Sequence, residues 1–104
     1  MCWFVDDAPE PPRAFWREAY PEMASEGANR ERANRAGYEV LFTERLPERA
    51  WWANYYGPLR TRMHALKPGE IPADLLRETE TEIALFERYS DCYGYTFFAL
   101  KPVE

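Results

Sequence analysis

Three stretches of the chain carry the apolar, aromatic and β-branched residues that are typical of strands. Residues 2–5 are apolar and stop at Asp6-Asp7, and residues 38–44 show a partial alternation of apolar and polar positions. Residues 93–100 are almost continuously apolar up to Pro102, which favours a strand covered on both faces. The pattern therefore predicts three strands.

Helical patterns fill the segments between these strands. Residues 13–20 end before Pro21, because a residue that precedes proline is biased away from the α region. Residues 23–36 are very polar and stop at Gly37, which we expect in the left-handed conformation that ends many helices. Residues 47–91 carry the longer helices, the last from residue 72 to about 91, so the pattern predicts four to five helices in total.

The stretch AWWANYYGPL, residues 50–59, concentrates four large aromatic side chains in one helix. Pro58 cannot donate a hydrogen bond to the Asn54 carbonyl and would clash with it, so the helix should kink or restart there, eased by Gly57. Trp51 and Tyr56 fall on different flanks of this helix. An apolar stripe recurs at spacings of three and four, formed by Trp52, Tyr55 or Tyr56, Leu59, Met63 and Leu66.

The aromatic side chains of this helix have two interpretations. Core packing explains Trp52 and Tyr55, whereas Trp51 and Tyr56 suit burial, a pocket wall or an interface equally well. The opposite wall would be formed by Trp3, Phe15, Trp16 and Tyr20. The candidate substrate pocket comprises Trp3, Trp16, Tyr20, Trp51, Trp52, Tyr55 and Tyr56.

Length and charge limit the classes of function. The 104 residues, 46% of them hydrophobic, suit a single domain over residues 1–104, and the net charge of −5 argues against nucleic-acid partners and anionic membranes. No apolar run approaches the ~20 residues that span a bilayer, and residues 1–12 lack the features of a secretory signal. Two cysteines without a CxxC motif favour a reducing cytoplasm, and with one histidine they make a poor zinc site.

Motifs for catalysis or metal binding are missing from the sequence, which has no GxGxxG, GxxxxGK[ST], GxSxG or HExxH. His64 is best read as a surface histidine on a helix, and we assign no catalytic, cofactor-binding or metal-binding residue. Asp6-Asp7 follows a strand, where α/β folds place ligands, although a solvated turn explains it more simply. The glutamates of residues 78–87 suit an exposed helix face.

Five motifs, in this order and spacing, resemble the C-terminal part of class I S-adenosylmethionine-dependent methyltransferases of the small-molecule type. They are WFVDDAPEPP (3–12), FWREAYPEM (15–23), AGYEVL (36–41), LPERAWWANYYGPL (46–59) and YSDCYGYTFFALKP (89–102). The resemblance covers nearly the whole chain but less than half of a complete enzyme of that family.

The resemblance implies an α/β fold, a partial Rossmann-like methyltransferase sheet with helices on both faces. Its three strands would lie at about residues 2–5, 38–44 and 93–100, with the last strand central and antiparallel between the other two. Residues 47–91 would be a helical insertion between the last two strands and would help to close the substrate side. The reaction implied is transfer of a methyl group to a small-molecule acceptor.

The sequence departs from the family in the half that binds the cofactor. The family holds S-adenosylmethionine with a glycine-rich loop after its first strand and an acidic residue after its second, and neither is found here. We therefore expect this chain alone to bind no cofactor and to be inactive. It would be a truncated gene product, the product of a start codon assigned too late, or half of a split enzyme. Whether the chain itself is an enzyme stays open.

The fourth strand of the family's sheet is also missing from this chain. Its absence would leave residues 2–5 as a free sheet edge, and such edges invite pairing with another chain. The edge predicts a homodimer or a complex with a complementary N-terminal half. The alternative functions are a stand-alone module that binds a small molecule with the aromatic helix, and an interaction module that uses the free edge.

Overall fold

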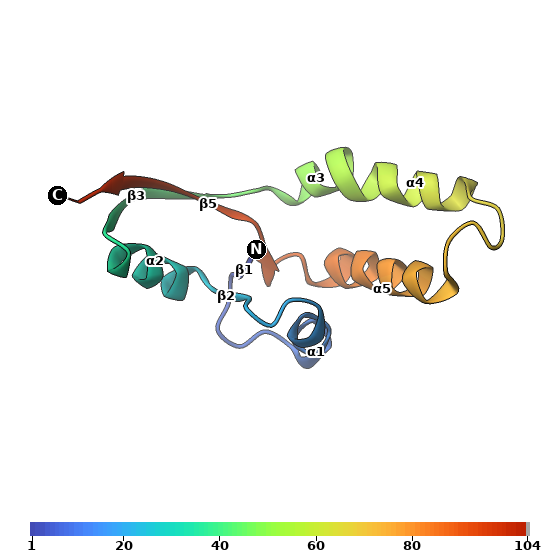
Figure 1. Ribbon diagram of the computed structural model, residues 1–104, viewed down its shortest axis with the longest axis horizontal. Helices are drawn as coiled ribbons and strands as arrows, with labels where there is room; N and C mark the ends of the chain where they lie inside the picture. Colours follow the sequence, from blue (N-terminus) through green and yellow to red (C-terminus); the bar gives the residue numbers. More distant parts are fainter. Residues whose placement is uncertain (104) are drawn as a thin grey trace. The chain divides into compact units, whose positions relative to one another are not determined.

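The computed structural model describes residues 1–103, which form five strands in two small sheets together with several helices (Figure 1). The first sheet has the order β2-β1-β4, in which β1 (Cys2–Trp3) pairs parallel with β2 (Ala24–Ser25) and antiparallel with β4 (Tyr93–Gly94). The second sheet pairs β3 (Tyr38–Arg45) antiparallel with β5 (Thr96–Pro102). The protein is therefore a mixed α/β fold.

The chain divides into two compact units, and the expectation of one domain stays a prediction. The first unit contains Met1–Leu46 and the C-terminal segment from Asp91, and therefore both sheets. The second unit is Pro47–Ser90, which is entirely helical apart from its loops.

The last predicted strand is divided in two. Residues 93–94 pair with β1 and residues 96–102 pair with β3, both antiparallel, so the expected neighbours are present. The expectation that this strand is central in one sheet is wrong, because Tyr95 interrupts the pairing. At this point β3 has ended, and the backbone N–H of Leu46 donates to the Tyr95 carbonyl at 2.9 Å. The middle strand of the three-stranded sheet is β1.

The expectation of a free sheet edge at residues 2–5 is also wrong. Beyond β1, the Phe4 N–H donates to the Cys92 carbonyl at 2.7 Å, and on its other side β1 has β2 as a parallel neighbour. We expected Ala24–Ser25 inside a helix. Ser25 instead precedes the helix and accepts a hydrogen bond from the Ala28 N–H at 3.0 Å, which leaves these two residues extended.

The helices of the first unit begin where prolines and a serine cap allow. The helix α1 (Glu10–Ala19) starts three residues before the expected position, because Pro11 and Pro12 lie in its first turn. The N–H groups of a first turn have no acceptor within the helix, so proline costs no hydrogen bond there. The helix α2 (Glu26–Arg35) is followed by Gly37 at φ 94°, which confirms the predicted glycine stop.

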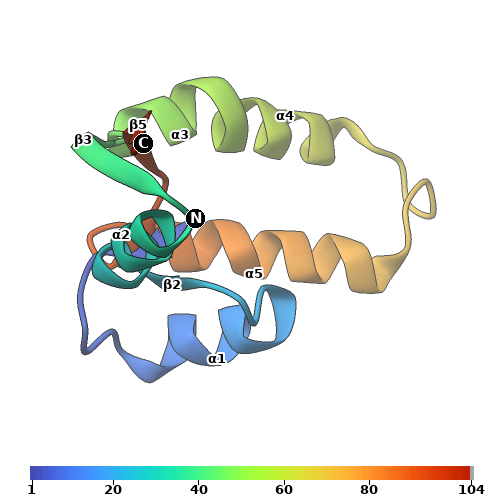
Figure 2. The same ribbon diagram turned by 60° about the vertical axis from the view of Figure 1, so that its left-hand side comes forward.

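The second unit is a pair of helical segments that run back along each other (Figure 2). The first segment is continuous through α3 (Glu48–Trp51), the π-helical turn η1 (Trp52–Tyr56) and α4 (Gly57–Ala65), and the second is α5 (Ala73–Tyr89). The predicted irregularity before Pro58 is confirmed. It takes the form of the wide turn η1, in which the Gly57 N–H donates to the Trp52 carbonyl, five residues earlier.

Each unit has its own buried core. The strands β3 and β5 are part of the first unit but contribute no residue to its buried core. Cys2, Trp16 and Tyr93 are buried in the first unit, and a helix–helix core is buried in the second. The expectation that residues 93–100 are covered on both faces is wrong, because Phe97 on β5 is 58% exposed. Phe42 on the neighbouring strand is 63% exposed, so the apolar character of these strands does not reflect burial here.

Candidate functional site

The seven aromatic residues expected to line one pocket fall into two groups, one in each unit. Trp3, Trp16 and Tyr20 belong to the first unit, and residues 51–56 supply the other four in the second.

A cavity of about 170 Å³ in the first unit brings Trp3, Trp16 and Tyr20 together. Arg13, Trp16 and Arg17 reach it from α1 and Tyr20 from the residue after that helix, because positions i, i+3, i+4 and i+7 share one helix face. Trp3 comes from β1, which pairs with β2. The remaining lining residues are Pro21 and Met23.

The walls of this cavity are fixed by the core of the first unit. The rings of Trp3 and Trp16 each meet the buried Tyr93 ring edge-to-face, with centroids 5.7 Å apart in both pairs. Phe15 meets Trp16 in the same manner at 5.0 Å. Such edge-to-face pairs hold their rings in a defined orientation, so the aromatic walls are set before a ligand arrives.

Two arginines give the cavity its charge. The Arg17 guanidinium lies 3.3 Å from a carboxylate oxygen of Glu10 in an exposed ion pair, a kind that contributes little to stability. The Arg13 guanidinium has neither a hydrogen bond nor an ion pair with any residue of 1–103, and Arg13 is exposed. The Trp16 indole N–H is buried and has no acceptor within the described chain.

A second cavity, of about 200 Å³, shares Trp3 and Arg13 with the first. It is also lined by Val5, Asp6, Ala8 and Ser25. Asp6 lies in an exposed turn, as expected, and also lines this cavity, although no ligand role follows from that position alone. Arg13 stands where the two cavities meet, since it lines both.

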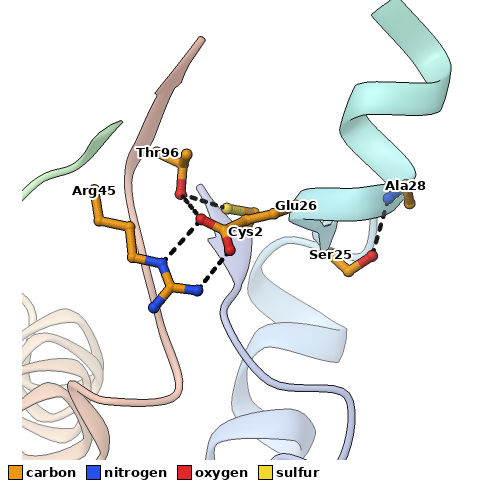
Figure 3. A network of polar contacts seen from close by, with 6 residues as sticks. All are labelled: Cys2, Ser25, Glu26, Ala28, Arg45 and Thr96. Atoms are coloured by element: carbon orange, nitrogen blue, oxygen red, sulfur yellow. Dashed lines mark hydrogen bonds and ion pairs between the residues drawn. The ribbon is translucent and has the colours of Figure 1, made fainter. Parts of the chain in front are cut away.

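A network of polar side chains ties the two sheets of the first unit together (Figure 3). Arg45 donates two hydrogen bonds to the Glu26 carboxylate, at 3.0 and 2.6 Å, and Thr96 donates a third at 2.7 Å. The Cys2 thiol donates to the Thr96 hydroxyl oxygen at 3.2 Å. β1, α2, β3 and β5 each contribute one of these residues, so the network links elements that are far apart in sequence.

The protonation of this network follows from its contacts. Hydrogen bonds from Arg45, more than any other cause, hold the pKa of the Glu26 carboxyl below its usual range. Burial raises the pKa of the Cys2 thiol, and its hydrogen bond to Thr96 offsets part of that effect. A buried thiol with a raised pKa is a poor nucleophile, so Cys2 is not activated for nucleophilic attack.

In the second unit, the aromatic residues of the helix 48–65 pack into a core. Trp51 is 4% exposed and stacks on Tyr56, 1% exposed, with ring centroids 5.5 Å apart. Both rings contact Phe86 of α5, at 4.7 and 5.2 Å, and the Tyr56 hydroxyl donates to the Glu82 carboxylate at 2.7 Å. These two rings therefore serve helix packing.

The expected apolar stripe has the wrong phase. Tyr55, assigned to the core, is 48% exposed, and Trp52 is half-buried, whereas Trp51 and Tyr56 are inside. In an uninterrupted α-helix, residues five apart would point about 140° apart. The π-helical turn η1 winds more slowly, which brings Trp51 and Tyr56 to the same side.

Sequence reasoning missed Arg13, Arg17, Met23 and the polar network. The spacing of Arg13, Trp16, Arg17 and Tyr20 on one helix face was the available signal for the cavity. No signal in the sequence pairs Glu26 with Arg45 or Thr96, because these contacts depend on how the sheets assemble.

Metal ligation and membrane spanning find no support in the part of the chain described. Within residues 1–103, no group of three or more His, Cys, Asp or Glu side chains is arranged to hold a metal ion. None of the helices in that range combines the length and the apolar character needed to cross a membrane. His64 is exposed on α4.

Comparison with known proteins adds no family to these observations: no protein-family model and no curated protein matches the chain.

Proposed function

We propose that this chain is the C-terminal part of an S-adenosylmethionine-dependent methyltransferase that acts on a small molecule. The proposal rests on the order and spacing of the five sequence motifs. The pairing of the C-terminal segment is the observation that supports it. β4 runs antiparallel to β1 and β5 runs antiparallel to β3, so this segment pairs with the two strands that the resemblance makes its neighbours.

The residues of this chain do not fit the cofactor. β1 is followed by Phe4-Val5-Asp6-Asp7 rather than by a glycine-rich loop. A Cβ added at Gly27 would meet only the Ser25 Oγ at 3.9 Å, and one added at Gly37 or Gly69 would meet no atom of the described chain within 4 Å. These glycines therefore do not form a crowded cradle of the kind that holds a pyrophosphate or a sulfonium nucleoside. We assign no cofactor contact to this chain.

The cavity beside Trp3 is where we propose that the methyl acceptor binds. Methyl transfer depends on the alignment of acceptor and donor, and aligned reactants gain much of their rate from orientation. Rings held by edge-to-face contacts with Tyr93 are suited to fix the orientation of a small molecule. In this proposal the aromatic residues 51–56 stabilise the helical unit and are not assigned to the acceptor.

The reading frame upstream of Met1 provides the test. We expect it, or an adjacent gene, to encode a glycine-rich loop between a strand and a helix, with an acidic residue after the next strand. The protein that includes this segment should bind S-adenosylmethionine in a calorimetric titration, and the 104-residue chain should not. The proposal fails if no such segment is encoded, or if the 104-residue chain binds the cofactor saturably.

A stand-alone small-molecule-binding module is the second candidate. The observation in its favour is that residues of this chain alone line the cavity beside Trp3. It would bind its ligand with no additional chain and no cofactor. Interaction through a free edge at residues 2–5 is not retained, since β1 has a strand on each side.

A further inference from the structure

The lining of the cavity beside Trp3 is positively charged in an acidic protein. Its seven lining residues include Arg13 and Arg17 and no carboxylate, whereas the whole chain has a net charge of −5. Glu10 is engaged with Arg17 at 3.3 Å, and Asp6 lines the adjoining cavity rather than this one. An anionic ligand would therefore find favourable charge at this place although the protein as a whole repels it.

Arg13 is the residue best placed to receive the anion. It lines both cavities and its guanidinium has no hydrogen-bond or ion-pair partner among residues 1–103, so the five N–H donors of that group are not committed to another side chain. A guanidinium presents these donors in a planar fork that matches the two oxygens of a carboxylate. A free surface arginine is ordinary in itself, and its position at the junction of two cavities is what indicates a ligand.

The remaining walls suit a single planar ring. Trp3 and Trp16 contribute indole surfaces, Tyr20 a phenol ring, and Met23 a thioether, which makes favourable contacts with aromatic rings. The volume of about 170 Å³ can hold one such ring, since an apolar cavity of about 150 Å³ holds benzene.

We propose that this cavity binds an aromatic carboxylate, with the ring against Trp3 and Trp16 and the carboxylate on the guanidinium of Arg13. The inference deepens the proposed function and rests on it only in taking this ligand to be the methyl acceptor. Binding itself is a property of the cavity and requires no cofactor.

Titration of the full chain with benzoate, followed by tryptophan fluorescence and calorimetry, tests the proposal. Benzyl alcohol supplies the ring without the charge, and acetate supplies the charge without the ring. We expect benzoate to bind at least about tenfold more tightly than either, because only benzoate uses both parts of the site.

Arg13→Gln is the deciding variant, and we expect it to weaken benzoate binding about tenfold while leaving benzyl alcohol binding unchanged. Arg13 is exposed, so this variant should fold, which far-UV circular dichroism checks. Arg35→Gln is the matched control, since Arg35 is an exposed arginine on α2 that lines neither cavity, and it should leave both affinities unchanged.

Three results would overturn the inference. They are no binding of benzoate up to about 10 mM, equal affinities for benzoate and benzyl alcohol, or an Arg13→Gln variant that binds benzoate as tightly as the parent chain. None of them bears on the search for a cofactor-binding segment, so failure here is distinguishable from failure of the proposed function.

Discussion

Gly57 ends the π-helical turn of the second unit, at a point where the backbone leaves no room for a side chain. Its N–H donates to the Trp52 carbonyl, and its own conformation is helical at φ −60° and ψ −57°. A Cβ built at this position would overlap the Trp52 carbonyl oxygen. We therefore predict that Gly57→Ala destabilises the protein, although alanine is the better helix former.

The magnitude follows from two opposing effects. Glycine to alanine in an ordinary helix interior stabilises by about 1 kcal/mol. Forcing an atom into a space that is already filled costs about 1 to 3 kcal/mol, and here the obstacle is backbone rather than a flexible side chain. The clash should prevail, with a net loss of up to about 2 kcal/mol and a fall in Tm of roughly 4 to 8 °C per kcal/mol.

Gly27→Ala is the matched control, because Gly27 is also helical and its added Cβ would meet only the Ser25 Oγ at 3.9 Å. It should leave stability unchanged or raise it by up to about 1 kcal/mol. Urea unfolding of both variants, followed by far-UV circular dichroism and by tryptophan fluorescence, measures the difference. If Gly57→Ala stabilises the chain as Gly27→Ala does, the reasoning about the π-helical turn is refuted.

Three further predictions concern the polar contacts. The pKa of Glu26 is lowered in the folded state, so its ion pair with Arg45 stabilises the fold above the unfolded-state pKa of ~4.3, and this stability is lost as pH falls through the folded-state pKa. Glu26→Gln should therefore destabilise the protein at neutral pH and progressively less in acid. Urea unfolding at a series of pH values would show this dependence. Tyr56→Phe should cost about 1.5 to 3 kcal/mol in thermal unfolding, because it removes the hydrogen bond to the Glu82 carboxylate, and an unchanged Tm would contradict that bond. Burial and a raised pKa should make Cys2 unreactive toward a thiol reagent until the chain unfolds, so rapid labelling in the native state would count against its position.

Local signals in the sequence located several features of the fold. Gly37 follows α2 in the left-handed region, and the helix around Pro58 restarts where proline removes a donor. Both are properties of one or two residues and their immediate neighbours. The general mixture of small strands and helices also follows from local composition.

Features that depend on distant residues were not accessible in this way. The phase of the aromatic helix was misjudged because the π-helical turn shifts every residue after Trp52, although the proline that accompanies the turn was recognised. The two-residue strand β2 owes its conformation to pairing with β1 and to the Ser25 cap. The cavity depends on α1 meeting β1, so only the helix-face spacing of its arginines and aromatics could be read from the sequence.

The pair of strands β3 and β5 helps to separate the two functional candidates. Phe42 and Phe97 lie on the same face of this pair, since Phe42 is opposite Ala99 and Phe97 is opposite Glu44, two residues further along the strand. Both rings are more than half exposed, and a two-stranded sheet gains little stability without a further layer. Burial of apolar surface contributes roughly 25 cal/mol per Å², so a further layer of protein over this face would stabilise the strands substantially. A stand-alone monomer would have to keep these rings in water, whereas a longer chain that supplies a further layer over this face would cover them, and this favours the first proposal over a monomeric binding module.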